Sequence, residues 1–379
     1  MPRDGLNGEE ILWTGGPREA LTPPLFEVTA WVGFGIATVA VAFACVRSIG
    51  LGQSPAGSLL FAVWAVTVGL VSRTLPAWWI AGARFTVTER SVIWQRGPFR
   101  RTLDRAAISY ARITWSARSA HVGTLELIRA VPTGALRRRL ALRLDGLESP
   151  DGVLAIIRGA AAVASPGHGT LPIAQRLDHD ERVLWSARPL PSLRAYLPRS
   201  VEEWSLAATA LGLLIVSITL GCRTVILERR VLHQGGFSLR SVPFWALTCG
   251  MSVAIAVVLG TAIFIAKSTL VRRARALHDT RYVISNKRVL IQRGREELHL
   301  ERNRIVDVIE APAGEGTRNL FLVIDGPKAR AVATSGAFGE PDTGPDLRPV
   351  FECVRDSDGA RRVLRGGKAS IPPPKRHAA

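Results

Sequence analysis

Residues 84–97 read RFTVTERSVIWQRG, and residues 281–294 read RYVISNKRVLIQRG. The two stretches align without a gap at an offset of 197 residues, and the match continues to Ile108 in the first copy and to Ile305 in the second. A shared Gln-Arg-Gly in the same register makes a chance match a poor explanation. The chain therefore contains an internal duplication, and the rest of the sequence is arranged around it.

Each copy predicts three short antiparallel strands. Apolar and polar residues alternate over residues 85–88, which is the period-2 pattern of a half-buried strand. A polar break of hairpin length follows, and Val92-Ile93-Trp94 is a β-branched and aromatic run typical of a second strand. Gly97 permits the positive φ of a tight turn before a third strand that ends near Leu103.

Both copies share one pattern. It begins with aromatic-x-hydrophobic-Thr/Ser-x-Arg/Lys-x-hydrophobic and continues with a hydrophobic run, a glycine and a later Leu-Asp/Glu-x-x-x-Ile. It resembles the bacterial pleckstrin-homology (PH-like) domain of membrane proteins, over residues 83–163 and 280–365. The resemblance implies for each copy a bent seven-stranded antiparallel sheet closed by a C-terminal helix. It also implies a role in membrane scaffolding or assembly without catalysis. The alternative is a pair of unrelated β-rich domains.

A second duplicated motif precedes each copy, at an offset of 172 residues. Residues 8–17 read GEEILWTGGP, and residues 180–189 read DERVLWSARP. A similar acidic Leu-Trp leader precedes the membrane helices of the PH-like family. One interpretation places the amphipathic Trp13 and Trp185 at the level of the lipid headgroups. The other packs each tryptophan on its own soluble domain.

Apolar segments predict two transmembrane hairpins, at residues 25–80 and 204–267. The first segment, Phe26–Val46, would be about 31 Å long as a helix, which is enough to cross a bilayer core. In the second segment, either Arg73 reaches the interface or the helix breaks near Pro76. A loop over Arg223–Ser241 is expected between the two crossings of the second hairpin.

The predicted fold is therefore integral-membrane α-helical hairpins plus two β-rich PH-like domains. The first domain is expected to end in a helix capped by Ser149 or Asp151, and the second in a helix over Leu347–Leu364 capped by Asp346. The predicted order is a leader at 1–24, a hairpin at 25–80, a PH-like domain at 83–163, a linker with the second leader at 164–203, a hairpin at 204–267, a PH-like domain at 280–365 and a disordered basic tail at 366–379.

Composition indicates an anionic partner. Lys and Arg number 49 against 31 Asp and Glu, which gives a formal net charge of +18. Such a charge is typical of proteins that meet nucleic acid or an anionic membrane surface. Nucleic acid is disfavoured, because the sequence has no helix-turn-helix pattern and no strand face with repeated aromatic residues.

Basic residues at the helix exits predict that the soluble domains and both termini face the cytoplasm, in a bacterial inner membrane. These residues are Lys267, Arg272, Arg273 and Arg275 after one helix, and Arg84, Arg90 and Arg96 after the other. The opposite loop counts against this orientation, since it carries Arg223, Arg229, Arg230 and Arg240. The four cysteines have no metal or disulfide spacing, which favours a reducing compartment for the soluble parts.

No catalytic, metal or cofactor motif is recognisable, so the chain is predicted not to be an enzyme. The acidic run Asp178-His179-Asp180-Glu181 is interpreted as a polar linker or helix start. The apolar segments hold no acidic pair, which disfavours a channel or a pump.

Basic clusters near the membrane are the remaining candidates for contacts with anionic lipids or with a partner, since each charge near the surface adds about 1 kcal/mol of attraction. They comprise Arg96, Arg100, Arg101, Arg272, Arg273, Arg275, Lys287 and Arg293. Candidate interfacial anchors are Trp13, Trp185, Trp78 and Trp79. The alternative is that the arginines only fix the topology and keep the surface soluble.

The sequence therefore predicts a membrane-anchored scaffold that binds a membrane-protein partner and assists assembly or stability of a membrane complex. An anionic-lipid-binding or sensing protein is one alternative. A membrane enzyme or transporter with a site between the hairpins is the other.

Overall fold

The computed structural model describes residues 9–19, 24–51, 54–130, 139–160, 169, 171–173, 176–190, 196–198, 201–233, 242–314, 316–324 and 347–366. The chain divides into two compact units. The β unit comprises Met1–Leu21, Ala77–Ser192 and Ala276–Ala379, and the helical unit comprises Thr22–Pro76 and Leu193–Arg275. Most of the expected tail, residues 367–379, lies outside the described residues.

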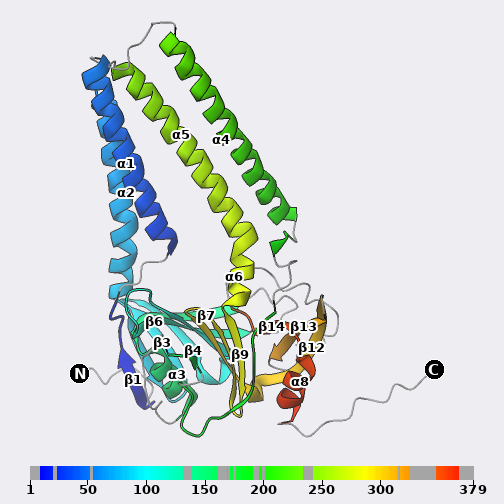
Figure 1. Cartoon of the computed structure of the whole chain (residues 1–379). Coiled ribbons are helices and arrows are strands. Elements are labelled where there is room, and N and C mark those ends of the chain that lie inside the picture. The colour runs from blue at the N-terminus through cyan, green and yellow to red at the C-terminus, as the bar shows by residue number, and fades with distance from the viewer. Residues whose placement is uncertain are drawn as a thin grey trace, which may run out of the picture. The chain divides into compact units, whose positions relative to one another are not determined.

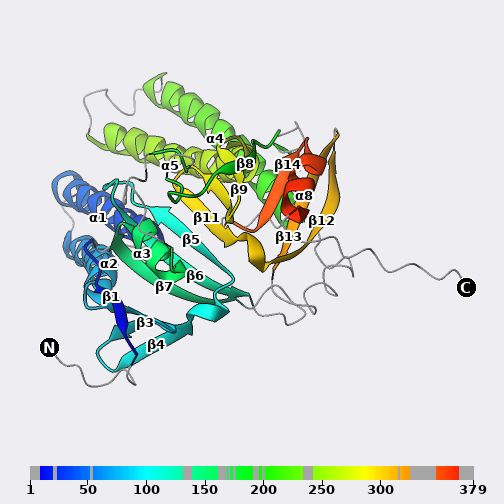
Figure 2. The ribbon, with the colours of Figure 1, turned by 90° about the horizontal axis from the view of Figure 1, so that it is seen from below.

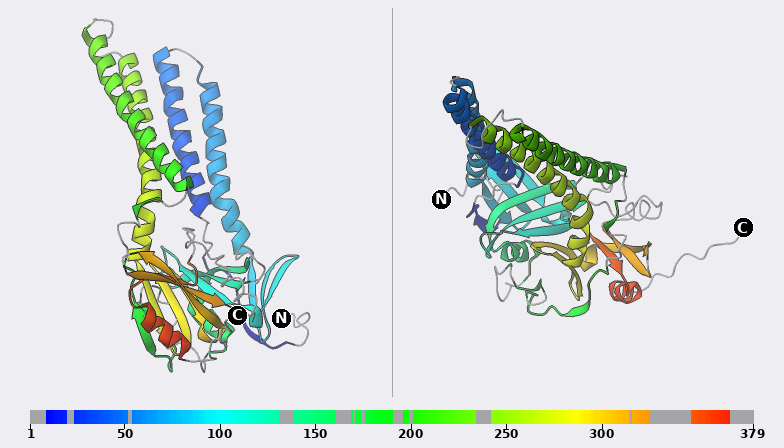
Figure 3. Two further views of the ribbon diagram at one scale, coloured as in Figure 1. Left: turned by 90° about the vertical axis from the view of Figure 1, so that its right-hand side faces the viewer. Right: turned by 45° about the horizontal axis from the view of Figure 1, so that its top comes forward.

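The long helices are α1 (Pro24–Leu51), α2 (Ala56–Ala81), α4 (Val201–His233) and α5 (Val242–Ala266) (Figures 1 and 3). A π-helical turn (Lys267–Val271) and α6 (Arg272–His278) follow α5. Among the described residues, four helices are long and apolar enough to cross a membrane, over Leu25–Cys45, Ala56–Ala81, Val201–Arg230 and Thr248–Val271. The two predicted hairpins of apolar helices are therefore present in the fold.

Two details of the predicted hairpins differ in the structure. Helix α2 runs through Pro76 without a break, so of the two alternatives for the second segment the helix break is excluded. Helix α4 continues to His233, so the first part of the loop expected from Arg223 is helical, because this stretch is rich in helix-forming residues. The rest of that loop, residues 234–241, lies outside the described residues.

Small residues form the packed face between α1 and α2. Ala30, Ala37 and Ala44 are buried on α1, and a Cβ added to Gly33 would lie 2.9 Å from the carbonyl oxygen of Ala65 on α2. Small side chains let two helix backbones approach closely where lipid supplies no hydrophobic driving force between helices. Large apolar residues of α1 such as Trp31 remain exposed, as expected for a helix surrounded by lipid.

The strands of the described residues form three antiparallel sheets. The first holds, in order, β1 (Ile11–Gly15), β2 (Arg84–Thr88), β3 (Ser91–Arg96) and β4 (Phe99–Asp104). The second holds β7 (Arg139–Glu148), β6 (Val122–Ala130), β5 (Tyr110–Trp115), β11 (Glu296–Glu301), β10 (Arg288–Arg293), β9 (Thr280–Ser285) and β8 (Val183–Ala187). The third holds β12 (Ile305–Gly314), β13 (Thr317–Ile324) and β14 (Val350–Val354).

The seven-stranded sheet belongs to both repeats, as Figure 2 shows. Strands β5–β7 come from the first repeat and β8–β11 from the second, and they join where β5 pairs antiparallel with β11. Among the described residues, each repeat still contributes seven strands. They are divided between two sheets as four plus three, whereas the resemblance implies one bent sheet for each repeat.

A C-terminal helix closes each repeat. Helix α3 (Pro150–Arg158) has Ser149 at its N-cap position, although the Ser149 side chain makes no capping hydrogen bond. Helix α8 (Ser357–Arg365) is capped by Asp356, whose side chain accepts from the Gly359 backbone N–H at 3.0 Å. The helix predicted over Leu347–Leu364 is therefore wrong in its first part, where β14 forms instead. Its predicted cap, Asp346, lies outside the described residues.

The duplicated arginine after each meander binds the closing helix. Arg105 donates from Nε to the Ile157 carbonyl at 2.9 Å and from Nη2 to the Ile156 carbonyl at 3.1 Å. Arg302, its counterpart, donates to the Val363 carbonyl on α8. Helices leave their last carbonyls unpaired, and these guanidinium groups supply the missing donors. The shared Leu-Asp/Glu-Arg motif thus fastens the meander to the helix in both repeats.

The Leu-Trp leader forms the outer strand of each meander, since β1 pairs with β2 and β8 with β9. The acidic residue of each leader then accepts a hydrogen bond from the hairpin that follows the paired strand. Glu9 accepts from the Thr88 hydroxyl at 2.6 Å, and Glu181 accepts from the equivalent Ser285 hydroxyl at 2.5 Å. The two leader acids therefore have the same role in both repeats.

Substitution of Glu181 by alanine tests this role. Glu181 also binds the buried guanidinium of Arg288, so the Glu181→Ala variant is expected to lose about 3 kcal/mol or more of unfolding free energy. In Glu9→Ala, the matched control, the serine Ser91 stands where the second repeat has Arg288, and the expected loss is about 1 kcal/mol. Denaturant unfolding of the solubilised protein measures both, and equal losses would contradict the assignment.

Candidate functional site

Buried charges gather where the two repeats meet. We define the junction cluster as Arg158, Arg176, Asp178, Glu181, Arg288, Glu297 and His299. Arg288 donates to Glu181 Oε2 at 2.8 Å from Nη2 and lies 3.4 Å from Asp178 Oδ1. Arg158 of the first repeat reaches the other oxygen of Asp178 at 3.4 Å. The cluster therefore joins α3 of the first repeat to β10 of the second through the residues between them.

A second ion pair joins Arg176, which precedes β8, to Glu297 on β11. Arg176 donates to both carboxylate oxygens of Glu297, and His299 Nε2 lies 3.4 Å from Glu297 Oε2. The side chain of Glu297 is fully buried, and that of Arg176 is 2% exposed. Removing one partner of such a pair leaves an uncompensated charge inside the protein. Arg176 is therefore needed for Glu297 to remain charged and buried where β11 meets β5.

Burial and ion pairing shift the pKa values of the carboxyl groups in this cluster in opposite directions. Burial raises the pKa of Glu181, but hydrogen bonds from Arg288 and Ser285 outweigh it, and the pKa lies below its ordinary value. Burial also raises the pKa of Glu297, and the neighbouring His299 and the hydrogen bonds from Arg176 bring it below its ordinary value. Burial lowers the pKa of His299, against the attraction of the nearby Glu297, so its imidazole is neutral at pH 7.

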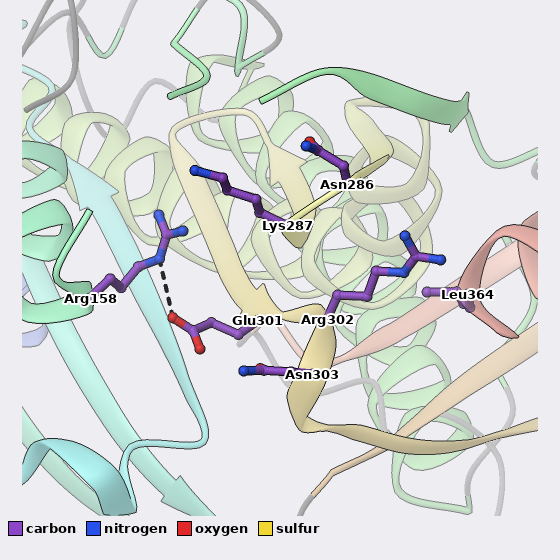
Figure 4. Close-up of a pocket in the computed structure, with 7 residues that line it drawn as sticks. All are labelled: Arg158, Asn286, Lys287, Glu301, Arg302, Asn303 and Leu364. Carbon is purple, nitrogen blue, oxygen red and sulfur yellow. Dashed lines mark ion pairs between the residues drawn. The ribbon is translucent and has the colours of Figure 1, made fainter. Parts of the chain in front are cut away.

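A polar groove of about 410 Å³ opens beside this cluster (Figure 4). We call it the junction groove, and it is lined by Arg158, Asn286, Lys287, Glu301, Arg302, Asn303 and Leu364. Arg158 comes from α3 of the first repeat, whereas the other residues belong to the second. The groove therefore depends on the sharing of one sheet by the two repeats.

The groove combines a net positive charge with neutral donors and acceptors. Arg158 Nε faces Glu301 Oε1 at 3.4 Å, as the dashed line in Figure 4 marks. Lys287 Nζ lies 2.5 Å from Asp180 Oδ1, and this hydrogen bond lowers the pKa of Asp180. The Asp180 side chain is 73% exposed, so the pair contributes little to stability.

Four of the sequence-predicted residues meet at the end of α2. The guanidinium carbon of Arg96 lies 3.6 Å from the ring centroid of Trp79 and 5.1 Å from that of Trp78. The ring of Phe99 lies 6.4 Å from that of Trp79, and a cavity of about 190 Å³ is lined by Trp79 and Arg101 among others. We call Trp78, Trp79, Arg96, Phe99 and Arg101 the α2-end cluster.

The α2-end cluster has the composition of a membrane interface. Trp78 is 68% exposed and Phe99 61% exposed, although both are large and aromatic. Tryptophan and arginine at the end of an apolar helix suit the headgroup region, where one part of each side chain is apolar and the other polar. The cluster occurs once in the described residues, because Arg275 and Ala276 stand where the first repeat has Trp78 and Trp79. Glu296 also replaces Phe99 and pairs with Arg293 at 2.6 Å.

The other predicted residues lie apart from these sites. Arg100 is exposed on β4, and Arg272 and Arg275 are exposed on α6, while the side chain of Arg273 lies outside the described residues. Trp185 stacks on Phe351 with ring centroids 5.7 Å apart and donates from Nε1 to Asp356 at 3.1 Å.

The two leader tryptophans adopt the packing that the second interpretation expected. Trp185 packs against the core of the second repeat, and Trp13 packs against the core of the first repeat. Both are half-buried.

Sequence reasoning missed the residues that come together only through the shared sheet. Arg158 and Glu301 are far apart in the chain and belong to no common motif. The sequence did contain a signal for Glu181, because it stands at the same place in its leader as Glu9 does in the first leader.

Comparisons with protein-family models, with curated proteins and with solved structures give no match to this chain. Within the described residues, no group of three or more His, Cys, Asp or Glu side chains is placed to hold a metal ion. The functional proposal therefore rests on the architecture described above, namely helices that can span a membrane and three antiparallel sheets, one of which is shared by the two repeats.

The buried imidazole of His299 predicts a stability change with pH. In the unfolded chain it gains a proton near pH 6.5, but in the folded chain only at lower pH. Its contribution is therefore fully present above about pH 6.5 and is lost as pH falls, by up to about 1.4 kcal/mol per pH unit.

Denaturant midpoints measured from pH 7.5 to 5.5 test this. They should fall for the wild type and stay flatter for His299→Gln. The control His278→Gln changes an imidazole that is 81% exposed and should keep the wild-type slope. Equal slopes for the wild type and His299→Gln would contradict the assignment.

Proposed function

We propose that the protein is a non-enzymatic scaffold with two PH-like repeats, anchored in a membrane by its apolar helices. It binds a protein partner in the junction groove and assists assembly or stability of a membrane complex. The observation that carries the proposal is that one groove receives side chains from both repeats. A partner bound there contacts the joined pair of repeats and not a single one.

The PH-like assignment is supported by the order of elements in each repeat. A leader strand and a three-stranded meander are followed by three further strands and a closing helix, and this order occurs twice. The arginine that follows Leu-Asp/Glu in both copies fastens the meander to the closing helix.

The chemistry of the junction groove suits an acidic peptide segment. Arg158 and Lys287 supply positive charge, Asn303 can pair with a peptide backbone, and Leu364 offers an apolar contact. Charge complementarity of this kind favours one partner over others and speeds association. No reaction is required of these residues, which fits a binding role.

We place the β unit on the cytoplasmic side of a bacterial inner membrane. Lys267, Arg272, Arg273 and Arg275 follow α5 on its way to β9, and such charges favour the cytoplasmic side of a helix. Membrane lipids and a membrane-protein partner are then the expected neighbours, and nucleic acid is not.

Charge reversal in the groove tests partner binding. Lys287→Glu puts a negative charge beside Asp180 and is expected to lower recovery of a stoichiometric partner about tenfold, a loss of ~1.4 kcal/mol. Arg90→Glu is the matched control, since Arg90 occupies the equivalent hairpin turn of the first repeat and lines neither of the two cavities. The measurement is quantitative mass spectrometry of tagged protein captured from native membranes.

Two results would contradict the groove as the partner site. One is equal recovery with both variants, and the other is equal loss with both. Denaturant midpoints of the two variants show whether a loss reflects binding or folding.

Anionic-lipid binding is a second candidate function, and the α2-end cluster favours it. Arg96 stacks on two tryptophans, and Arg101 lines a neighbouring cavity together with Trp79. A headgroup phosphate can pair with these arginines while the aromatic rings contact the acyl region.

Removal of the Arg96 charge tests lipid binding. Arg96→Gln is expected to lower the amount of anionic lipid retained per chain about fivefold, since one charge near the membrane contributes about 1 kcal/mol. The control is Arg293→Gln, which changes the equivalent arginine of the second repeat, whose guanidinium pairs with Glu296. Native mass spectrometry in mild detergent measures the retained lipid. A loss of the same size in both variants would count against a site at the end of α2.

A further inference from the structure

Strand β4 has an open edge among the described residues. It is the last strand of its sheet, and its residues Phe99–Thr102 are all exposed. In the second repeat the equivalent residues Glu296–His299 pair with Ala111–Thr114 of β5, and Glu297, Leu298 and His299 are buried there. The same strand is therefore covered in one repeat and open in the other.

The outward-facing backbone groups of β4 follow from the covered copy. The Trp115 N–H donates to the Arg295 carbonyl at 3.0 Å, so residue 295 of the second repeat faces β5. Facing groups alternate along an antiparallel ladder, so residues 297 and 299 face β5 as well. At the offset of 197 residues, Arg100 and Thr102 of β4 therefore point their N–H and carbonyl groups toward the open edge.

Strand β12 is the counterpart of β5, and its outer edge is also open among the described residues. It is the last strand of its sheet and pairs there only with β13. The N–H of Val308 donates to the side chain of Asp307 at 2.9 Å, so this group points away from the β13 ladder. Val308 and Glu310 stand at the positions that Ala111 and Ile113 occupy on β5.

We propose that β4 of one chain pairs antiparallel with β12 of a second copy of the same chain, and so repeats between chains the contact that β5 and β11 make within one chain. In the register of the existing pair, Arg100 lies opposite Glu310 and Thr102 opposite Val308. Opposite charges directly across an antiparallel pair stabilise it. Glu310 already accepts from Arg318 and Arg361, and a carboxylate has room for a further donor.

The pairing ends at Pro312. This proline stands where β5 has Trp115, and it lacks the N–H that Trp115 uses. The proposed ladder is therefore short, and the charge pair between Arg100 and Glu310 supplements it. Because β4 and β12 are different surfaces, the contact is head-to-tail and closes into a ring if the rotation between copies allows it. This self-association goes beyond the proposed function, in which the partner is a protein other than this chain.

Disulfide trapping between differently tagged chains in native membranes tests the pairing. One chain carries Arg100→Cys and the other Glu310→Cys, in a background in which Cys45, Cys222, Cys249 and Cys353 are replaced by alanine. Residues opposite each other in a hydrogen-bonded pair lie about 5.5 Å apart at Cα, within disulfide range. A disulfide-linked heterodimer is expected, at least tenfold above the level given by Arg100→Cys with the control His278→Cys, an exposed position on α6.

A backbone variant separates pairing from folding. Arg100→Pro removes an N–H that faces the open edge and leaves the β3 ladder intact, so co-purification of the two tagged chains should be lost while the denaturant midpoint is unchanged. Arg100→Ala keeps the N–H and should lose less. A disulfide yield no higher than that of the His278→Cys control would overturn the proposal. Co-purification of Arg100→Pro chains at the wild-type level would overturn it as well.

Discussion

The pairing of β5 with β11 is the interaction on which the β unit depends. It joins three strands of the first repeat to four of the second and makes the seven-stranded sheet continuous. Glu297 is fully buried at this contact and is neutralised by Arg176. The junction cluster thus determines that the two repeats behave as one unit, and it creates the groove that neither repeat has by itself.

Duplication supplied two equivalent meanders, and later differences in sequence gave them different surroundings. The first meander has Phe99, Arg100 and Thr102 where the second has Glu296, Glu297 and His299. Glu297 and His299 fit a buried position only because Arg176 and Arg288 reach them. The β4 residues Phe99–Thr102 are exposed and suit an open edge. One repeat therefore provides the core of the junction and the other provides a surface.

Local patterns predicted the local parts of the fold. Alternation over residues 85–88 and the glycines after each hairpin predicted both meanders, and the apolar segments predicted the long helices. The helix predicted over Leu347–Leu364 was wrong in its first part, because Leu347, Phe351 and Val354 fit a helical period as well as a strand. The contact of β5 with β11 was not predictable, since it joins residues about 185 positions apart and depends on which side chains can share a buried charge.

The same limit applied to the candidate sites. Trp78, Trp79 and Arg96 were each predicted as separate candidates, and the fold brings them together at the end of α2.

The central claim is that β5 and β11 form one interior ladder. Hydrogen–deuterium exchange of the solubilised protein tests this claim most directly. The account predicts that the amides of Ala111, Ile113, Glu297 and His299, which face the β5–β11 ladder, exchange as slowly as those of β10. Rapid exchange of both segments, as in unpaired edge strands, would contradict it.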